Sequence, residues 1–453
     1  RVGQMLAQNG AWESRQLIAP NVLHTTLTGA QKPPDLAARA AADPSPATGL
    51  GWWSNADGYW QDIPNDAVLG AGAGDQILLV IPSLDLVAVR NGGDLVSEGD
   101  RRGWQARLDY IVRPVVESLA VRSPVPSSPV ITDIRWDPPG QVRRTVLGGH
   151  TRDGSDNWPL TWADDGQLYT AYGDGYGFEP QQTPDKLSLG FAVVTGGPDD
   201  FVGYNIRSDG ERLGPGPKGE KASGLLCVDG VIYLWVRNAD GEGNCGRLAW
   251  SEDHMKSWEW ADWKFAEFGH PSFVNFGRNY EGARDDYVYV ISHDHTSAYK
   301  QADRILLARM AKDAIREPED YEFFVGTSVG TPVWSHDLSK VGAIFTHPGQ
   351  CRRSSMSYVP GLGRYLLWQQ LTIDGSDTRF QSGFGLYDAP EPWGPWTTVF
   401  FTDRWDIGPG DLGHVNAKWT SDDGCTIWLV FAGSDNFCAR RGRLTLSALP
   451  ATA

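Results

Sequence analysis

One short pattern recurs five times in the last two thirds of the chain, and it constrains the fold more strongly than any other feature. In each copy, a tight turn rich in Asp or Gly leads into a strand that carries an aromatic residue. The copies begin at Asp165, Asp229, Asp285, Gly361 and Asp423, at spacings of about 55 to about 80 residues. This spacing suits a unit of four short antiparallel strands with extended loops. The pattern therefore predicts a mainly β protein that contains a five-bladed β-propeller.

Two segments support this prediction because they are similar to the Asp-box turn of sialidase-type propellers. They are residues 251–258 and 421–428. In such a turn, Ser and Asp side chains bond to the backbone of a tight hairpin, and the Trp packs between blades. The first segment departs from the usual pattern because Met255 stands where Gly is expected.

The first part of the chain has a different pattern, in which helical and strand signals alternate. Amphipathic helices are expected at residues 4–8, 21–27 and 104–119, the last with a kink at Pro114. Antiparallel strands are expected at residues 49–54, 69–80 and 84–90. The sequence therefore predicts a partial α+β domain over residues 1–121. A Pro/Ser linker is expected over residues 122–130, and the propeller over residues 131–453.

Residues 1–120 resemble the C-terminal part of a serine β-lactamase-like hydrolase. This family includes class C β-lactamases, esterases and 6-aminohexanoate-dimer hydrolases. The segments TGLGWWSNADG (residues 48–58) and GAGAGDQILLVIPSLDLVAVRNGG (residues 70–93) carry the resemblance. It implies that the strand near Gly72 faces a Ser nucleophile in an S-x-x-K motif, with a Y-x-N element after it. Neither motif occurs in residues 1–121. Either the catalytic half lies on an upstream portion, or the domain serves as a structural platform.

Charge and composition restrict the expected partners. The 40 Lys and Arg residues are outnumbered by 56 Asp and Glu residues, which gives a formal net charge of −16. A nucleic-acid site needs a basic face, so no nucleic-acid partner is expected. No stretch of roughly 18 apolar residues occurs, so no membrane span is expected. The 20 Trp and 53 Gly residues suit clefts that stack on sugar rings, and we expect a secreted or periplasmic protein with a polysaccharide or oligosaccharide substrate.

The densest cluster of reactive side chains lies in residues 155–180. Asp156 precedes one expected strand and Asp174 follows the next, so both are expected at one end of the central funnel. Glycoside hydrolysis needs two carboxylates about 5 to 10 Å apart, one as acid and one as base or nucleophile. Asp156 and Asp174 are therefore the candidate catalytic residues. The alternative is that both are turn and cap residues, a common role of Asp.

The propeller region resembles a bacterial family described as a domain of unknown function, some of whose members are endo-D-arabinanases. The likeness covers residues 131–446. It is carried by segments such as DNWPLTWADDGQLYTAYGDGYGF, KASGLLCVDGVIYLWVRN and CRRSSMSYVPGLGRYLLWQQ. The resemblance implies a propeller and a carbohydrate substrate. The relatives' Asp-Leu-Gly and Gly-Asp-Thr segments fall on residues 156–158 and 173–175, and this chain departs from both.

Further residues are expected to shape the substrate site. The aromatic candidates for stacking on sugar are Trp158, Tyr172 and Trp235, and the polar candidates are Lys221, Arg237, His293, Arg353 and Tyr358. No cofactor is required by this chemistry. The segment His293-Asp294-His295 has donor types able to hold a divalent ion such as Zn²⁺ or Ca²⁺, or it forms a hydrogen-bonded loop.

Two other functions stay open beside hydrolysis. In a polysaccharide lyase, an Arg neutralises the carboxylate of a uronate while a His or Tyr removes the C5 proton. Arg353, His270, His293 and Tyr358 are the residues expected to take these roles. The other function is binding of a sugar without catalysis, because the same fold serves both purposes.

Overall fold

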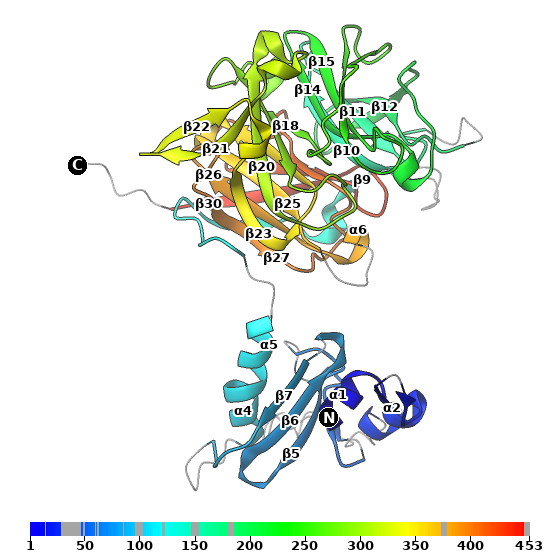
Figure 1. Cartoon of the computed structure of the whole chain (residues 1–453), viewed down its shortest axis with the longest axis vertical. Helices are drawn as coiled ribbons and strands as arrows, with labels where there is room; N and C mark the ends of the chain where they lie inside the picture. The colour runs from blue at the N-terminus through cyan, green and yellow to red at the C-terminus, as the bar shows by residue number, and fades with distance from the viewer. Residues whose placement is uncertain are drawn as a thin grey trace. The chain divides into compact units, whose positions relative to one another are not determined.

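The computed structural model of the chain divides into two compact units, Arg1–Val121 and Arg122–Ala453 (Figure 1). We call them unit 1 and unit 2. The structure describes the chain except for residues 14, 29–46, 49, 59, 61–62, 85, 96–102, 120–122, 146–153, 180–184, 373–377 and 448–453. Among the described residues, no helix is both long and apolar enough to cross a membrane.

Unit 1 is an antiparallel sheet with helices on both faces. Its five strands, in spatial order, are β3 (Ala47–Thr48), β4 (Trp53–Ser54), β5 (Val68–Gly72), β6 (Gln76–Ile81) and β7 (Leu86–Arg90). Its helices are α1 (Val2–Ala7), α2 (Pro20–Thr28), α4 (Gly103–Arg107), the π-helical η3 (Leu108–Val112) and α5 (Arg113–Leu119). A short hairpin, β1 (Ala11–Trp12) and β2 (Arg15–Gln16), lies between α1 and α2.

Strand alternation explains the two covered faces of this sheet. Val68 pairs with Val80, and both pack with leucines of α1 and α2. Their neighbours Leu69 and Leu79 point to the other face and pack with Trp104 and the rest of the helix from α4 to η3. Successive side chains of a strand point to opposite faces, so the same two strands serve both helical layers. This layout agrees with the α+β type expected from the sequence.

The structure corrects one expected strand of unit 1. Residues 69–80 were expected to form a single strand, but they form the hairpin of β5 and β6. The turn between them includes Gly74 at φ +72°, a conformation that Gly adopts more readily than other residues. The segment 70–76, GAGAGDQ, has the Gly and Asp residues typical of a turn, and the expectation of a single strand overlooked this signal.

Unit 2 consists of five successive antiparallel meanders and is mainly β, as predicted (Figure 1). The first has β10 (Asp156–Trp162), β11 (Leu168–Gly173), β12 (Gly190–Thr195) and β13 (Val202–Ile206). The second has β14 (Lys221–Val228), β15 (Val231–Arg237), β16 (Gly246–Ser251) and β17 (Glu259–Trp260). The third has β18 (Ser272–Asn275), β19 (Tyr287–His293), β20 (Ala302–Ala311), β21 (Glu322–Ser328) and β22 (Thr331–Ser335), with β23 (Ala343–Cys351) paired to β20.

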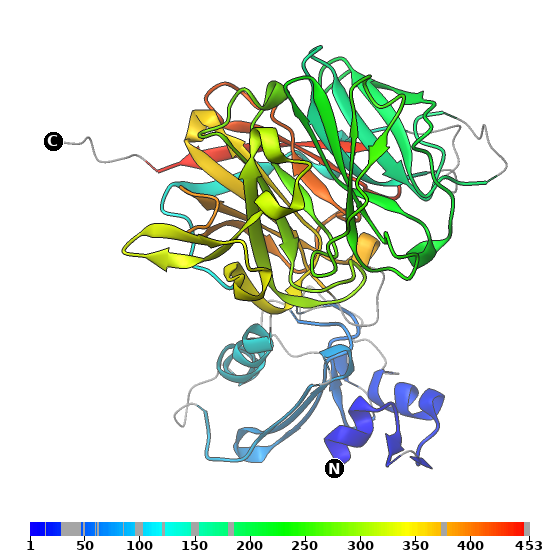
Figure 2. The ribbon, with the colours of Figure 1, turned by 45° about the horizontal axis from the view of Figure 1, so that its top comes forward.

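The last two meanders complete the unit. The fourth has β24 (Ser354–Val359), β25 (Arg364–Gln370), β26 (Phe384–Ala389) and β27 (Thr397–Thr402), and the helix α6 (Thr378–Gln381) lies in its β25–β26 connection. The fifth has β28 (Gly413–Val415), β29 (Thr426–Phe431), β30 (Cys438–Leu446), β8 (Ile131–Trp136) and the short β9 (Arg143–Arg144). Its strand β8 comes from the start of unit 2 and pairs with β30, which is red in Figures 1 and 2. The two ends of unit 2 therefore meet in one sheet.

The first strands of the meanders form a closed ring. Strand β10 packs beside β14, β14 beside β18, β18 beside β24, β24 beside β28, and β28 beside β10. The first strands are almost wholly buried, whereas the fourth strands β13 and β27 are half-buried or exposed. The ring therefore lies at the centre of unit 2 and the fourth strands lie at its rim.

The five recurrent turns of the sequence all lie between the first and second strands of a meander. The first and third turns share one set of bonds. Asp165 accepts hydrogen bonds from the Gln167 amide and from the hydroxyl of Tyr169, and Asp285 has the same two kinds of donor in Tyr287 N and Tyr289 Oη. An Asx turn closed by a Tyr hydroxyl thus explains the Asp and aromatic positions of the repeat.

The segment expected to be a linker is bound to unit 2 along its described residues. Ser127 forms a bridge to Thr398 of β27, and the Ser128 amide donates to the carbonyl oxygen of Thr398 at 2.8 Å. The amide and hydroxyl of Thr398 donate to the carbonyl oxygens of Pro126 and Val125 at 2.7 Å each. Pro and Ser favour an extended conformation, which here adds to a sheet edge instead of spanning open solvent.

Candidate functional site

Every meander of unit 2 places polar side chains at the end where its first strand begins and its second strand ends. We call this the Asp156 end, and the opposite end, which carries the recurrent turns, the Asp165 end. Residues at or just before the first strands are Asp156, Lys221, His270, Arg353 and Asp411. Residues at or just after the ends of the second strands are Asp174, Arg237, His293 and Gln370. All of them except Asp174 are buried.

The two predicted catalytic carboxylates lie in this group. Asp156 is the first residue of β10, and its register partner on β11 is Gly173, the residue before Asp174. A side-chain carbon at Gly173 would lie 2.8 Å from Asp156 Oδ1, so this position needs Gly. The pairing of β10 with β11 therefore brings Asp156 next to the strand end that carries Asp174.

Two ion pairs connect neighbouring meanders of the ring. Lys221 Nζ bonds to Asp174 Oδ1, and Arg353 Nη1 bonds to Asp411 Oδ1. The side chains of Lys221, Arg353 and Asp411 are all less than a tenth exposed. Burial of a charge is costly unless a counter-charge and hydrogen bonds compensate it, so these pairs neutralise the cations within the site.

Asp156 is connected to the second meander through an amide. Asn157 Nδ2 donates to Asp156 Oδ1 at 2.9 Å, and Arg237 Nη2 donates to Asn157 Oδ1 at 3.1 Å. The other oxygen, Asp156 Oδ2, is 3.7 Å from Arg379 Nη1 of α6. Asn157 therefore orients both the carboxylate and the guanidinium.

His270 and His293 of the third meander are buried, and burial lowers the pKa of both. Burial lowers the pKa of His293 to about 4, and its Nε2 lies 3.0 Å from the Ser297 carbonyl oxygen, to which it donates. Burial, and then the positive charges of Arg237 and Arg353, hold the pKa of His270 well below its usual range. Both ring nitrogens of His270 are buried without a hydrogen-bond partner among the described residues.

Tyr299 completes the site from the loop between β19 and β20. Asn238 Nδ2 donates to the Tyr299 hydroxyl at 3.1 Å, and the Tyr299 ring centre lies 5.2 Å from Arg237 Cζ and 5.8 Å from Arg353 Cζ. Burial alone would raise the pKa of Tyr299, but the charges of Arg237 and Lys221 and the bond from Asn238 lower it overall. Tyr299 is thus a half-buried hydroxyl in positive surroundings.

The structure contradicts the expected sugar-stacking role of three aromatic residues. Trp158 is 1% exposed, donates from Nε1 to the Ser155 carbonyl oxygen at 2.9 Å, and packs against Tyr172 and Phe178. Tyr172 is equally buried in the same apolar cluster. Trp235 is fully buried in another cluster of apolar and aromatic residues. Their rings are buried in apolar clusters and leave no exposed face for stacking on a sugar.

Tyr358 also lies elsewhere than expected. It is the fifth residue of β24, which begins next to Arg353 and runs toward the Asp165 end, where Tyr358 pairs with Tyr365. Tyr358 borders a cavity of about 200 Å³ together with residues such as Trp162 and Asp422. The expected combination of Tyr358 with Arg353 and His293 is therefore wrong, and Tyr299 is the tyrosine that lies near Arg353.

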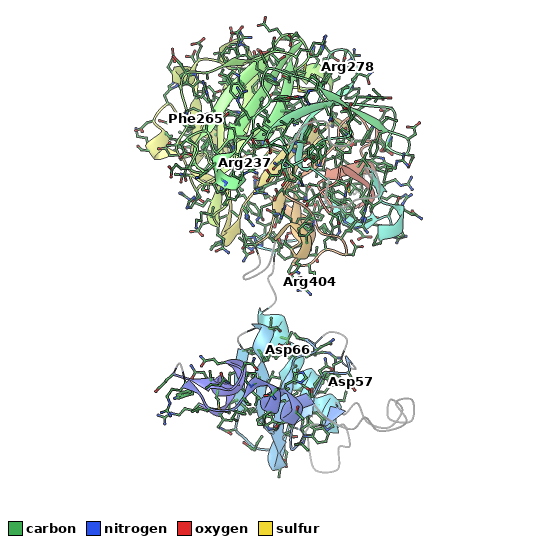
Figure 3. All side chains as sticks on the ribbon, turned by 90° about the vertical axis from the view of Figure 1, so that its right-hand side faces the viewer. Asp57, Asp66, Arg237, Phe265, Arg278 and Arg404 are labelled. Carbon is green, nitrogen blue, oxygen red and sulfur yellow. The ribbon has the colours of Figure 1, made fainter. Side chains whose placement is uncertain are left out.

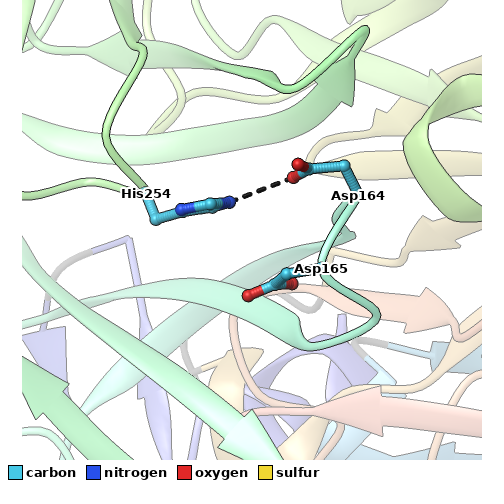
Figure 4. A group of neighbouring side chains, drawn as sticks. All are labelled: Asp164, Asp165 and His254. Atoms are coloured by element: carbon cyan, nitrogen blue, oxygen red, sulfur yellow. Dashed lines mark hydrogen bonds and ion pairs between the residues drawn. The ribbon is translucent and has the colours of Figure 1, made fainter.

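The segment His293-Asp294-His295 does not bring its donor atoms together. Asp294 forms an ion pair with Arg304 at 2.6 Å, and His295 Nδ1 accepts from the Ser297 amide at 3.0 Å. In the described part of the chain, the group of three possible metal ligands within 4.8 Å of one another is a different one, Asp164, Asp165 and His254 (Figure 4). There, His254 Nε2 lies 3.0 Å from Asp164 Oδ1, and Asp165 is bonded within its own turn.

Several site residues escaped the sequence interpretation: Asp411, Gln370, Tyr299, Arg379 and Asn157. Asp411 lies just before the very short strand β28, which has no clear strand pattern. Tyr299 lies in a loop, where no periodicity marks it. Of these residues, Asn157 and Gln370 lie about one strand length from a recurrent turn, whereas Asp411, Tyr299 and Arg379 lie farther along the chain from theirs.

Comparisons with known proteins add similarity but no assignment. No family model matches the chain, and no curated protein sequence is similar to it. Among solved structures, RS223 β-xylosidase has a TM-score of 0.39 and 12% identity over 67% of this chain and 95% of its own. The GH43_1 enzyme from Xanthomonas citri complexed with xylotriose has a TM-score of 0.38 and 13% identity over 68% and 92%. Trypanosoma rangeli sialidase with the inhibitor DANA has a TM-score of 0.36 and 14% identity over 63% and 44%. Because all of these TM-scores lie below 0.5, the likeness assigns neither fold nor function.

Proposed function

We propose that unit 2 is a five-bladed β-propeller that hydrolyses a glycosidic bond at the Asp156 end. The closed ring of five first strands and the pairing of β8 with β30 support the propeller. The observation that carries the activity is the register of β10 and β11, which brings Asp156 beside the strand end that carries Asp174. Two neighbouring carboxylates are the machinery that glycoside hydrolysis needs.

The surroundings of the two carboxylates suggest separate roles. Asp174 is paired with the Lys221 ammonium, which compensates a negative charge and suits a base or nucleophile. Asp156 is buried, and its nearest guanidinium nitrogen is 3.7 Å away, which suits a proton donor. In the reaction, the Asp156 carboxyl protonates the leaving glycosidic oxygen as its bond to the anomeric carbon breaks. Water supplies the oxygen that replaces it, with its proton taken up by the base.

The direct test is a product screen by mass spectrometry against neutral and uronate-containing polysaccharides, including arabinans. Hydrolysis adds one water to the fragments, whereas elimination adds none. Asp156→Asn and Asp174→Asn should each lower the rate about 10²- to 10⁴-fold, the usual loss for an acid or base. Asp164→Asn, the same change at the Asp165 end, should leave the rate unchanged. Normal rates for both site variants would refute the proposal.

A substrate with a good leaving group separates the two roles. A dinitrophenyl glycoside of the sugar identified in the screen needs no protonation as its bond breaks. Asp156→Asn should therefore cleave it nearly as fast as the wild type, while Asp174→Asn should stay slow. The opposite pattern would exchange the roles, and equal losses would show that neither residue is the proton donor.

A second candidate function is elimination on a uronate-containing glycan. The observation that favours it is the Tyr299 hydroxyl, which has a lowered pKa in the positive surroundings of Arg237 and Lys221. In this reaction the ionised Tyr299 oxygen takes the C5 proton, a C4–C5 double bond forms as the C4–O bond breaks, and the leaving oxygen takes up a proton from Tyr299 or from solvent, so that no water is added to the products. Tyr299→Phe should abolish the unsaturated product while leaving unfolding unchanged. An unaffected rate would exclude this function.

We also propose a secreted or periplasmic location, since a polymeric glycan is met outside the cytoplasm. Cell fractionation followed by detection of the chain tests this. Recovery from the cytoplasm alone would refute it.

A further inference from the structure

Arg237 differs from the other buried cations of unit 2. Four Lys or Arg residues are buried in the described chain, namely Lys221, Arg237, Arg353 and Arg440. Three of them are ion-paired with Asp, as in the pairs of Lys221 with Asp174, Arg353 with Asp411 and Arg440 with Asp406. Arg237, at 1% exposed, has no ion-pair partner among the described residues. A buried cation without a counter-charge is strongly unfavourable, so its retention calls for an explanation.

The guanidinium of Arg237 has two free donor groups. Nη2 donates to Asn157 Oδ1, but Nε and Nη1 are buried without a hydrogen-bond partner of normal geometry among the described residues, and the guanidinium lowers the pKa of the neighbouring Tyr299 hydroxyl. Arg237 is the last residue of β15 and therefore lies at the Asp156 end. In Figure 3 it is labelled well apart from Arg278, which donates to the Asp164 carbonyl oxygen and so marks the Asp165 end.

Other polar atoms at the Asp156 end also lack a hydrogen-bond partner among the described residues. His270 has two ring nitrogens without a partner, and Asn238 Oδ1 and His293 Nδ1 are also buried without one. The Tyr299 ring centre is 5.2 Å from Arg237 Cζ. Arg353 Cζ is 5.8 Å from the same ring centre, so both guanidinium groups lie near Tyr299. Among the described residues, these polar atoms have no hydrogen-bond partner and Arg237 has no carboxylate paired with it.

We propose that Arg237 binds an anionic substituent of the sugar, the carboxylate of a uronic acid, through its free donors. The inference rests on the proposed function in one respect, that the Asp156 end binds a glycan. A guanidinium presents parallel N–H groups that match the two oxygens of a carboxylate. A neutral sugar would satisfy hydrogen bonds but would leave the buried charge of Arg237 uncompensated. The structure thus assigns the substrate class as an acidic glycan.

The first test uses the unmodified full chain and no catalysis. Binding of D-glucuronate, its methyl ester and D-glucose is measured by calorimetry, and the same series is repeated with D-galacturonate. The acids should bind about 10- to 100-fold more tightly than their esters and neutral sugars, the gain expected for hydrogen bonds to a charged group. Equal affinity of acid and ester in both series would overturn the proposal.

Variants of Arg237 provide the second test. Arg237→Gln should lose the preference for the acid, and Arg237→Lys should keep part of it. Since Arg237 has no ion pair to lose, Arg237→Gln should be at least as resistant to thermal unfolding as the wild type. A purely structural Arg would give the reverse pattern, a lower unfolding temperature with the acid preference retained. Arg278→Gln, an Arg change at the Asp165 end, is the control and should keep the preference.

The design separates this inference from the proposed function. Acid binding by the wild type without cleavage of any glycan would refute hydrolysis and support the role of Arg237. Cleavage of neutral glycans only, with equal binding of acid and ester, would support hydrolysis and refute the role of Arg237.

Discussion

Replacing Asp411 with Asn should destabilise unit 2 strongly, although the change preserves the shape of the side chain. Asp411 and Arg353 form an ion pair in which the two side chains are 6% and 4% exposed. Asn cannot carry the negative charge that compensates the guanidinium. The positive charge of Arg353 would then remain buried without its counter-charge.

The size of the loss follows from this burial. Removing one partner of a buried ion pair costs about 3–5 kcal/mol, because the other charge stays uncompensated. For a unit of this size, each kcal/mol lowers the unfolding temperature by roughly 2 °C, so a decrease of about 6–10 °C is expected. Asp286→Asn is the matched control, since the Asp286 side chain is fully exposed and lies 4.0 Å from Lys312. Exposed pairs contribute about 0–1 kcal/mol, so the control should change little.

The assay is differential scanning calorimetry of the full chain, with the transition of unit 2 assigned by its larger enthalpy. The double variant Arg353→Met with Asp411→Leu removes both charges and should recover much of the loss, because apolar groups of similar size can replace a buried pair. Wild-type stability of Asp411→Asn, or a loss equal to that of Asp286→Asn, would refute the assumption that Arg353 depends on this carboxylate.

Three further outcomes are expected. Burial alone would raise the pKa of Asp137, but hydrogen bonds from Arg443 and Arg441 lower it overall. The contribution of Asp137 to stability is therefore full above about pH 4 and is lost as the pH falls further. Urea midpoints measured between pH 2 and pH 6 should fall more steeply for the wild type than for Asp137→Asn, and parallel curves would contradict this. Trp235→Phe should lower the free energy of unfolding in urea by about 1–3 kcal/mol and leave KM unchanged, because Trp235 is a core residue. A raised KM with normal stability would instead indicate that Trp235 stacks on the sugar. Asp253→Ala should lower the free energy of unfolding by roughly 1–2 kcal/mol, because the Asp253 carboxylate accepts hydrogen bonds from the hydroxyls of Ser251 and Ser257 and from two backbone amides. An unchanged urea midpoint would show that other contacts hold this turn.

The fold was predictable from the sequence wherever turn chemistry is local. The positions of Asp165 and Asp285 encode an Asx turn and a Tyr hydroxyl bond within five residues, so the pattern is visible in the sequence itself. The hairpin of β5 and β6 was predictable in the same way, because Gly74, Asp75 and Gln76 interrupt the apolar residues on either side, and the expectation of a single strand overlooked this turn signal.

The aromatic residues show the main limit of composition as evidence. A Trp that stacks on a sugar and a Trp that fills the space between strands have the same chemistry, and only burial distinguishes them. Trp158 and Trp235 alternate with other apolar residues on strands that are covered on both faces, which places them in the core. An excess of Trp is therefore weak evidence for a sugar platform in a protein whose inner strands are buried on both sides.

Most of the polar residues at the Asp156 end could nonetheless have been predicted from the sequence by their distance from the recurrent turns. Asp156 and Asp174 lie nine residues on either side of Asp165, and Lys221 and Arg237 lie eight residues on either side of Asp229. Arg353 and Gln370 stand at similar distances from Gly361. Because each turn joins the first two strands of a meander, one strand length in either direction reaches the Asp156 end. His270 and Asp411 break this spacing, since η6 (Arg278–Tyr280) and a longer connection lengthen the chain between each of them and its turn. The recurrent turns therefore mark the site from the far end of the strands, and polar residues one strand length away from them are the ones to mutate.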